Sequence, residues 1–310
     1  MTLTELRYIV AVAKHLHFGK AATSCHVSQP TLSLGIKKLE DELGVEIFER
    51  AARNEIRITH QGHRIIEQAQ RTLEEASNIK NIAQMHQDPL SGPLKIGVIY
   101  TIAPYLLPEL IPRIHRRAPD MPLLIEENYT VSLTEQLKQG QLDVIIIALP
   151  FDHPGIVTQT LYHEPFIVAA PGTDQWRKRK SISSQELATE SLLLLGPGNC
   201  FRDQILQACP ECRTSGDLQQ TLQGSSLETI RHMVATGAGI TVLPSSAYRK
   251  SSESKLLTMI PFSGTAPSRK VALAWRKSFT RSEAIEALRN EILHCKLHDV
   301  TMMENEAIRF

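Results

Sequence analysis

The chain of 310 residues is long enough for two domains or more. Its 42% hydrophobic and 22% charged residues are typical of a globular protein, and a net charge of +1 excludes a global attraction to nucleic acids or membranes, though not a local basic face. The N-terminus lacks a cationic segment followed by an apolar core, and apolar runs such as residues 144–149 are far shorter than the ~20 residues of a membrane helix. We therefore expect a cytoplasmic protein without a membrane segment, in which thiols are normally reduced.

Three short helices are predicted in the first 44 residues. Apolar residues follow helical spacing over residues 3–13 and again over residues 18–25. A third helix should begin after Ser28 as its N-cap, carry Pro30 in its first turn and end at Gly44. A tight turn before the third helix predicts a helix-turn-helix, and a plain helical bundle is the alternative.

The third helix leaves polar side chains off its apolar stripe, and these suit base edges and phosphates in a major groove. Residues 47–50 and 55–58 predict a hairpin, or wing, that would bring further arginines to the DNA-binding surface. Charge alone does not decide the matter, because residues 5–64 hold nine basic and seven acidic side chains. The candidate DNA-contacting residues are Ser28, Gln29, Pro30, Thr31, Ser33, Lys37, Arg50 and Arg53.

A longer set of residues in this region forms a pattern that would be hard to reach by chance. The set is Phe18, Ala21, Ala22, Val27-Ser28-Gln29-Pro30, Leu32-Ser33, Ile36, Leu39-Glu40, Leu43-Gly44, Ile47-Phe48 and Arg50. It resembles the winged helix-turn-helix of LysR-type transcriptional regulators. The resemblance implies that residues 1–58 bind double-stranded promoter DNA. One departure is His60, which follows Thr59 where the family usually has proline.

A long helix is predicted over residues 59–88. Small and apolar residues recur along it with spacings of four and three, which suits a two-stranded helical contact. They are Ile65, Ala69, Thr72, Ala76, Ile79 and Ala83. We expect this linker helix to pair two chains, as paired half-sites in DNA require. The alternative is a helix packed on its own domain.

Strands and helices alternate after a break at residues 88–93. Strands are predicted at residues 94–100, 123–129 and 142–149, and a second set at 165–170, 191–195 and 239–243. A strand at 270–275 and a helix at 282–294 would return to the first set. The alternation predicts a parallel α/β sheet in two lobes with a ligand-binding cleft.

The effector domain of LysR-type regulators has this organisation and is similar to a periplasmic-binding-protein fold. We therefore predict an α/β regulatory domain over residues 92–300, with lobe I at about 92–164 and 268–300 and lobe II at about 165–267. A solute-binding protein is the rival interpretation, and the DNA-binding head argues against it.

Three of the five cysteines lie between residues 196 and 212. A helix is predicted from Asn199 or Cys200 until Pro210 interrupts it. A thiol at a helix N-terminus is favoured as thiolate, so Cys200 is the candidate reactive thiol, with Arg202 nearby. In a helix, Cys200 and Cys209 are ~13 Å apart along the axis and point to opposite sides, whereas a disulfide needs Cα atoms within about 7 Å. The two could bond only if the segment refolds.

Several further motifs resemble the hydrogen-peroxide-sensing members of the LysR family. They are Ile99-Tyr100-Thr101, residues 125–130, residues 145–150, residues 198–204 with Cys209, and residues 225–234. The resemblance implies that peroxide oxidises Cys200 to a sulfenic acid and that Cys209 resolves it as an intramolecular disulfide. Thr101, Thr130 and Asn199 would line the peroxide pocket, and Arg269 would favour the thiolate.

The same resemblance implies a homotetramer, built as a dimer of dimers, that controls antioxidant genes. Oxidation would remodel residues 196–222 and rotate the dimers, which changes the contact with promoter DNA. RNA polymerase is a further candidate partner, and no cofactor is expected.

Two departures from the peroxide-sensing pattern concern chemistry. Asn199 stands where histidine is common, and an amide cannot transfer a proton near neutral pH. Cys212 adds a Cys-x-x-Cys with Cys209, which could form its own disulfide or half of a zinc site. Because no second ligand pair is present, we expect no metal.

Two other functions remain as alternatives. One is a LysR-type regulator that responds to a small organic effector in the cleft. The other is a thiol peroxidase, which would have no use for a DNA-binding head. We therefore expect a regulator and not an enzyme.

Overall fold

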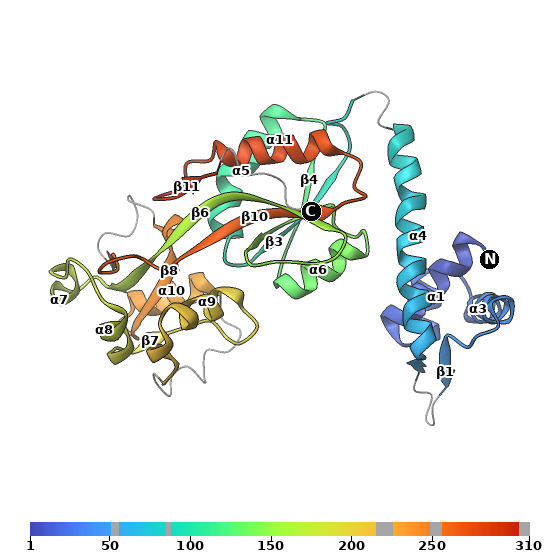
Figure 1. Cartoon of the computed structure of the whole chain (residues 1–310), viewed down its shortest axis with the longest axis horizontal. Helices are drawn as coiled ribbons and strands as arrows, with labels where there is room; N and C mark the ends of the chain where they lie inside the picture. Colours follow the sequence, from blue (N-terminus) through green and yellow to red (C-terminus); the bar gives the residue numbers. More distant parts are fainter. Residues whose placement is uncertain (51–55, 85–87, 215–225, 249–255, 304–310) are drawn as a thin grey trace. The chain divides into compact units, whose positions relative to one another are not determined.

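A computed structural model of the chain describes residues 1–50, 56–84, 88–214, 226–248 and 256–303. The chain divides into two compact units, Met1–Gln87 and Asp88–Phe310 (Figure 1). Among the described helices, none combines the length and apolar character that a membrane crossing requires.

The first unit is a three-helix head whose helix ends are set by local caps. Its helices are α1 (Leu3–His15), α2 (Phe18–Ser24) and α3 (Gln29–Leu43). The Ser28 side chain accepts a hydrogen bond from the backbone of Thr31 and caps α3, while Gly44 ends the helix in a left-handed conformation, with φ of 68°. Ile9, Leu32 and other apolar side chains are fully buried between the helices. The predicted helix-turn-helix is confirmed.

A short hairpin forms the wing and leads into the linker helix. Strands β1 (Phe48–Arg50) and β2 (Ile56–Ile58) pair antiparallel, and α4 (His60–Gln84) follows. The Gly62 backbone donates to Thr59 Oγ1 at 2.8 Å, so Thr59 caps α4 without the usual proline. A Cβ on Gly62 would lie 2.3 Å from the carbonyl oxygen of Ile47, so only glycine fits where α4 starts against the wing.

The linker helix buries apolar residues near its start and exposes one farther along. Ile66 and Ala69 are buried in the core of the head. Ile79 lies farther along α4 and is 69% exposed. The predicted stripe was therefore wrong at Ala69, because α4 packs on α1 over its first turns, and the stripe is free only farther along. Ala83 belongs to a stretch whose side chains lie outside the description.

The second unit is built on one continuous sheet in the order β4-β3-β5-β10-β6-β8-β7, to which β11 and β9 add on β6. The strands are β3 (Leu94–Ile99), β4 (Leu123–Asn128), β5 (Val144–Ala148), β6 (Ile156–Pro171), β7 (Leu192–Leu193), β8 (Ile240–Pro244), β9 (Leu257–Ile260), β10 (Ser268–Arg276) and β11 (Thr301–Met302). The predicted parallel sheet is wrong in part. Strands β3, β4 and β5 are parallel, but β10 runs antiparallel to both β5 and β6 because it returns from the second lobe.

Strand β6 is shared by both lobes. Its first part pairs with β10 as far as Pro165, and from Phe166 onward it pairs with β8. The sequence predicted only residues 165–170 as a strand. Proline has no N–H to donate, and Pro165 fits here because it lies where the partner strand changes. Tyr162 packs in the first lobe's core and Phe166 in the second lobe's core.

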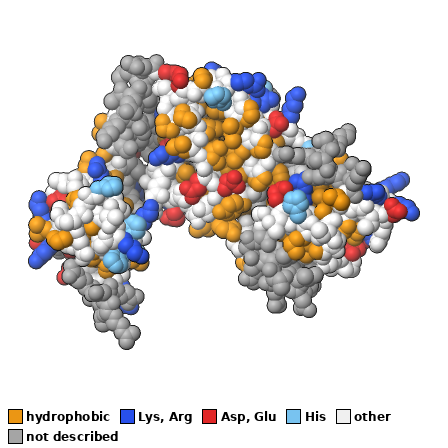
Figure 2. Space-filling view, turned by 180° about the vertical axis from the view of Figure 1, so that it is seen from behind, with side chains coloured by type: hydrophobic (Ala, Val, Ile, Leu, Met, Phe, Trp, Pro, Cys, Tyr) orange, Lys and Arg blue, Asp and Glu red, His pale blue; other side chains and the backbone are white. Residues whose placement is uncertain are grey.

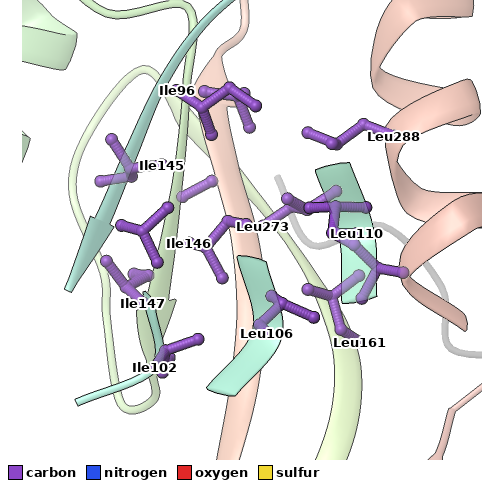
Figure 3. Close-up of a cluster of buried hydrophobic side chains, with 14 of the residues drawn as sticks. Ile96, Ile102, Leu106, Leu110, Ile145, Ile146, Ile147, Leu161, Leu273 and Leu288 are labelled. Atoms are coloured by element: carbon purple, nitrogen blue, oxygen red, sulfur yellow. The ribbon is translucent and has the colours of Figure 1, made fainter. Parts of the chain in front are cut away.

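Helices cover both faces of the first lobe. Helices α5 (Ala103–Arg117) and α11 (Ser282–Leu293) pack together, and α6 (Thr130–Lys138) packs on β3 and β5. Figure 3 shows the alternation along β5, where Ile146 points toward Leu106 and Leu110 while Ile145 and Ile147 point to the other side.

Helices of the second lobe surround its shorter strands. They are α7 (Asp174–Arg177), α8 (Ser184–Thr189), α9 (Cys200–Ala208) and α10 (Leu227–Ala235), with 3₁₀ turns η1 (Pro210–Thr214) and η3 (Ser245–Ala247). The predicted fold class, a winged helix-turn-helix with a linker helix and a two-lobed α/β regulatory unit, is confirmed.

Candidate functional site

Cys200 is the first residue of α9, as the sequence predicted. Gly198 turns the chain before it with a φ of 89°, a conformation that glycine adopts without strain. The helix is anchored by Phe201, which is fully buried, and by Ile205. Cys200 is a free thiol and is partly exposed. It therefore combines access with the positive end of a helix dipole, the setting that favours a thiolate.

A small cavity lies at the Cys200 thiol. Thr101, Thr130, Asn199 and Cys200 all line it, so the structure brings these predicted residues together. Its volume is about 10 Å³, the scale of one water molecule. The Thr130 hydroxyl donates to Cys200 Sγ at 3.9 Å. A cavity of this volume has room for a molecule about the size of water and none for an organic effector.

Two of these residues make other contacts as well. The buried Asn199 amide donates to the carbonyl oxygen of Gly196 at 3.2 Å. Thr101 Oγ1 accepts a hydrogen bond from Arg269 at 2.9 Å. Because that bond uses an acceptor lone pair, the Thr101 O–H remains a donor for another partner.

Arg269 lies behind the cavity wall and does not line the cavity. Its Nε donates to Glu164 Oε2 at 2.7 Å, and its Nη2 donates to the carbonyl oxygen of Thr101 at 2.9 Å. The guanidinium carbon lies 5.0 Å from the centre of the Phe201 ring. Burial lowers the pKa of Arg269, but the charge of Glu164 and its hydrogen bond act against burial, and the pKa is raised overall. Arg269 is thus a permanent buried cation that holds Thr101 in place.

Glu164 is a residue of this site that sequence reasoning missed. Its side chain is fully buried, and it lies directly opposite Arg269 on the neighbouring strand. Its Oε1 also accepts from the backbone of Ser246 in the second lobe at 3.3 Å. Glu164 directly precedes the predicted apolar strand at residues 165–170, and that position was the available signal, since a carboxylate buried beside such a strand needs a cationic partner.

Cys209 is bonded to Cys212, not to Cys200. The Cα atoms of Cys209 and Cys212 are 5.5 Å apart, and both residues are buried. The predicted Cys200–Cys209 bond is therefore absent in this form, and the Cys209–Cys212 alternative is present. The reason is local: α9 separates Cys200 from Cys209, whereas the turn η1 brings Cys212 back to Cys209. A zinc site would need these two sulfurs as separate thiolates.

A larger cavity of about 840 Å³ lies on another side of α9. Gln204 and Gln207 of α9 line it together with Thr158 and His163 of β6 and Lys270 of β10. Gln204 Nε2 donates to the carbonyl oxygen of Leu149 at 3.1 Å, while its buried Oε1 meets no hydrogen-bond partner among the described residues. A cavity of this volume is in the range of small-molecule sites.

The predicted DNA-contacting residues lie mostly at the exposed start of α3. Gln29, Pro30, Thr31 and Lys37 are exposed, and Ser33 is half-buried. The Ser28 hydroxyl is engaged with Thr31, its oxygen 2.8 Å from Thr31 Oγ1. Lys, Arg and His side chains are visible on one face of this unit (Figure 2).

Two predicted arginines have no described side chain. Arg50 ends β1, and Arg53 falls in residues 51–55, outside the described part. Leu34, which the sequence analysis did not single out, is 71% exposed on the same helix.

Two family descriptions match the chain. The bacterial regulatory helix-turn-helix protein of the lysR family matches residues 3–63, and the LysR substrate binding domain matches residues 87–294. The DNA-binding transcriptional dual regulator OxyR of Escherichia coli K12 is 40% identical over 276 residues, covering 89% of this chain and 90% of that protein. The hydrogen peroxide-inducible genes activator of Dickeya chrysanthemi is 38% identical, covering 96% of this chain and 97% of that protein.

Solved structures agree with this assignment. A full-length OxyR variant from Pseudomonas aeruginosa is 51% identical, with a TM-score of 0.80 over 99% of both chains. A reduced form of OxyR from Neisseria meningitidis is 49% identical, with a TM-score of 0.64 over 69% of this chain and 100% of that chain. The chain therefore belongs to the LysR family of bacterial helix-turn-helix regulators, and within that family it belongs with the OxyR proteins.

Proposed function

We propose that this protein is a hydrogen-peroxide-responsive transcription regulator in which Cys200 is the sensing thiol. The observation that carries the proposal is the Cys200 sulfur at the start of α9, 3.9 Å from the Thr130 hydroxyl in a cavity of about 10 Å³. Relatives named as hydrogen peroxide-inducible genes activators support it. Because bacterial promoter DNA lies in the cytoplasm, we propose that the protein acts there.

The proposed chemistry begins with the Cys200 thiolate. Its sulfur attacks one oxygen of hydrogen peroxide, the O–O bond breaks, and the departing hydroxide takes up a proton and leaves as water. The hydroxyls of Thr101 and Thr130 donate hydrogen bonds to the oxygens as negative charge moves onto the leaving one. The Asn199 amide can form hydrogen bonds but cannot transfer a proton near neutral pH, so the proton comes from elsewhere, such as solvent.

The sulfenic acid is then attacked by the Cys209 thiol, which releases a second water and forms a disulfide. Because α9 holds the two sulfurs apart, this bond requires α9 to unwind, and we propose remodelling of residues 196–222, of which 215–222 lie outside the described part. The refolded segment changes how the oligomer contacts promoter DNA and RNA polymerase.

We propose that the oligomer is a tetramer built from dimers. The exposed part of α4 near Ile79 offers one pairing surface. Apolar side chains also gather over the middle of one face of the second unit (Figure 2), which fits a second interface with another copy. Paired heads then match paired half-sites, contacted by the exposed residues of α3 and by the wing with Arg50 and Arg53.

The test uses the full-length chain, fully reduced, and a promoter fragment that it protects. A slight molar excess of hydrogen peroxide should consume the Cys200 thiol within seconds and change the footprint. Cys200→Ser should bind the same DNA but show no change with peroxide. A footprint that responds equally in Cys200→Ser would contradict Cys200 as the sensor.

A second candidate function rests on the cavity of about 840 Å³, which has room for a small organic effector. Its discriminating result is a Cys200→Ser variant whose DNA binding still changes with an organic ligand and not with peroxide. The matched relatives are transcriptional regulators, and we propose that peroxide is a signal here and not a substrate turned over. Sustained peroxide consumption at many equivalents with a reductant present would contradict that.

A further inference from the structure

Three cysteines lie at the two ends of α9 and in the turn that follows it, and they are in two different oxidation states. Cys200 at the start of α9 is a free thiol, while Cys209 at its end is bonded to Cys212 in η1. The proposed sensing reaction uses only Cys200 and Cys209. Cys212 has no role in that reaction, yet in this structure it is bonded to Cys209, the thiol that the reaction needs.

The folded segment accepts one of the two possible disulfides. The Cα atoms of Cys209 and Cys212 lie 5.5 Å apart with α9 intact, within the usual range for a disulfide. Cys200 and Cys209 are at opposite ends of a helix whose length, at ~1.5 Å per residue, keeps them ~13 Å apart. A Cys200–Cys209 bond therefore requires an unwound α9, and a Cys209–Cys212 bond does not.

Resting on the proposed function, we propose that Cys212 is a second resolving thiol, which returns Cys200 to its free state. In the Cys200–Cys209 disulfide, the Cys212 thiolate attacks Cys209 Sγ. The Cys209–Cys212 bond forms, the Cys200–Cys209 bond breaks, and Cys200 leaves as a thiolate. Summed over all steps, one hydrogen peroxide oxidises Cys209 and Cys212 to a disulfide and is reduced to two waters.

The fold drives this exchange forward. While α9 is unwound, the buried positions of Phe201 and Ile205 are lost. So are the edge contact between Phe201 and Phe166, 4.8 Å between ring centres, and the contact of Arg269 with the Phe201 ring. Exchange to Cys209–Cys212 lets α9 refold and restores all of these contacts. The number of disulfides stays the same, so the recovered packing favours the product.

Because Cys209 and Cys212 are buried, peroxide can oxidise them only through Cys200. Cys209 is 1% exposed and Cys212 is fully buried, so peroxide in solution does not reach their sulfurs in the folded chain. Cys209 Sγ also lies 3.3 Å from the carbonyl oxygen of Ser184, where a reduced thiol would donate its proton. Cys200 alone of the three is accessible, and unwinding of α9 by its oxidation exposes the other two.

The consequence is a sensor that resets its shape before it is reduced. After exchange, α9 is folded and Cys200 can react again, but no resolving thiol remains. A second equivalent of peroxide then gives a Cys200 sulfenic acid that persists. An arrangement with Cys200 free and Cys209 bonded to Cys212, as in this structure, is what the first cycle would leave.

The test is a time course on the fully reduced, full-length chain. One equivalent of hydrogen peroxide is added, samples are quenched in acid from milliseconds to minutes, free thiols are alkylated, and non-reduced peptides are mapped. We expect a Cys200–Cys209 peptide that appears first and decays as Cys209–Cys212 grows, with Cys200 alkylated at the end. In Cys212→Ser, Cys200–Cys209 should be the stable product. Cys295→Ser, which also removes one buried thiol, should behave as the unmodified chain.

Three results would overturn the relay. One is Cys200–Cys209 as the final product in the unmodified chain. Another is Cys209–Cys212 formation in Cys200→Ser at the unmodified rate, which would mean that peroxide reaches the pair directly. The third is an unreacted Cys200 in the unmodified chain and in Cys212→Ser, and this result alone also defeats the proposed function. The unmodified time course decides the matter even if Cys212→Ser does not fold.

Discussion

At the scale of single residues, the chemistry at Cys200 depends on which neighbours donate hydrogen bonds. Thr130 donates directly to the sulfur. Thr101 is oriented by Arg269 and keeps its own O–H for another acceptor. Both hydroxyls stabilise negative charge without competing as nucleophiles, because an alcohol is a far weaker nucleophile than a thiolate.

Replacing Thr130 by valine should slow oxidation of Cys200 by about fivefold, because one hydrogen bond contributes about 1 kcal/mol. The measurement is the second-order rate of Cys200 thiol loss with hydrogen peroxide. Thr130→Ser keeps the hydroxyl and should react at nearly the original rate. Equal rates for the valine variant and the unmodified chain would remove Thr130 from the reaction.

Cys295 should behave as the opposite of Cys200. Burial raises the pKa of the Cys295 thiol to about 12, and its Sγ donates to the carbonyl oxygen of Glu291 at 3.3 Å. A raised pKa favours the protonated form in the folded state. This contribution to stability is complete below the unfolded-state pKa of about 8.5 and is lost as the pH rises from there toward 12.

We therefore predict that Cys295 resists both alkylation and peroxide in the folded chain at pH 7 to 9, as tryptic mapping after iodoacetamide treatment would show. Rapid labelling of Cys295 at a rate comparable with Cys200 would contradict this. Labelling in urea provides the positive control, since unfolding restores an ordinary thiol.

At the scale of elements, two helix starts are fixed by contacts that allow little change. The chain turns at Gly198 before α9, and the helix presents Cys200 to the small cavity and Gln204 to the larger one. Helix α4 is capped by Thr59 and passes so close to the wing that a Cβ on Gly62 would clash with the carbonyl oxygen of Ile47. Each start couples a helix to the element before it.

Gly62→Ala should destabilise the DNA-binding head by about 2 kcal/mol, since the added methyl group forces α4 away from the backbone of Ile47. The measurement is urea unfolding of the full chain followed by a signal from the first unit, together with affinity for promoter DNA. Gln61→Ala changes the exposed neighbour in the same helix turn and should cost less than about 0.5 kcal/mol. Equal stability of the two variants would show that α4 can shift freely.

At the scale of the whole regulatory unit, buried polar contacts link the two lobes. Arg269 and Glu164 pair across β10 and β6, Arg269 reaches Thr101 in the first lobe, and Glu164 reaches Ser246 in the second. Tyr105 of α5 donates to Glu228 of α10 at 2.8 Å. Burial and the charge of Glu228 raise the pKa of Tyr105, so this hydroxyl remains a donor at neutral pH.

Arg269→Met should destabilise the regulatory unit by about 3–5 kcal/mol, because it leaves the Glu164 carboxylate buried without its cation. Arg269→Met combined with Glu164→Leu should recover much of that loss, since no uncompensated charge remains. Chemical unfolding of the four chains of this cycle measures the coupling. If the stability losses of the two single variants simply added up in the double variant, the interaction between Arg269 and Glu164 would contribute nothing to stability.

The sequence by itself determined those features whose causes lie within a few neighbouring residues. Ser28 and Gly44 bound the third helix, and Cys200 begins α9 while Pro210 follows its end, because capping and helix breaking act within one turn. Thr101, Thr130, Asn199 and Arg269 were predicted from family resemblance, since no local pattern connects them. The Cys-x-x-Cys spacing raised a Cys209–Cys212 bond only as an alternative.

Only the tertiary structure decided which distant groups meet. Arg269 and Glu164 are 105 residues apart and pair through the register of β10 on β6. The same register places Pro165 where a strand continues across a change of partner, and the packing of α4 on α1 buries Ala69 in the head. Thr130 reaches Cys200 because α6 and α9 meet from different lobes. These contacts depend on how the elements pack together, and a residue's near neighbours in sequence carry no record of that packing.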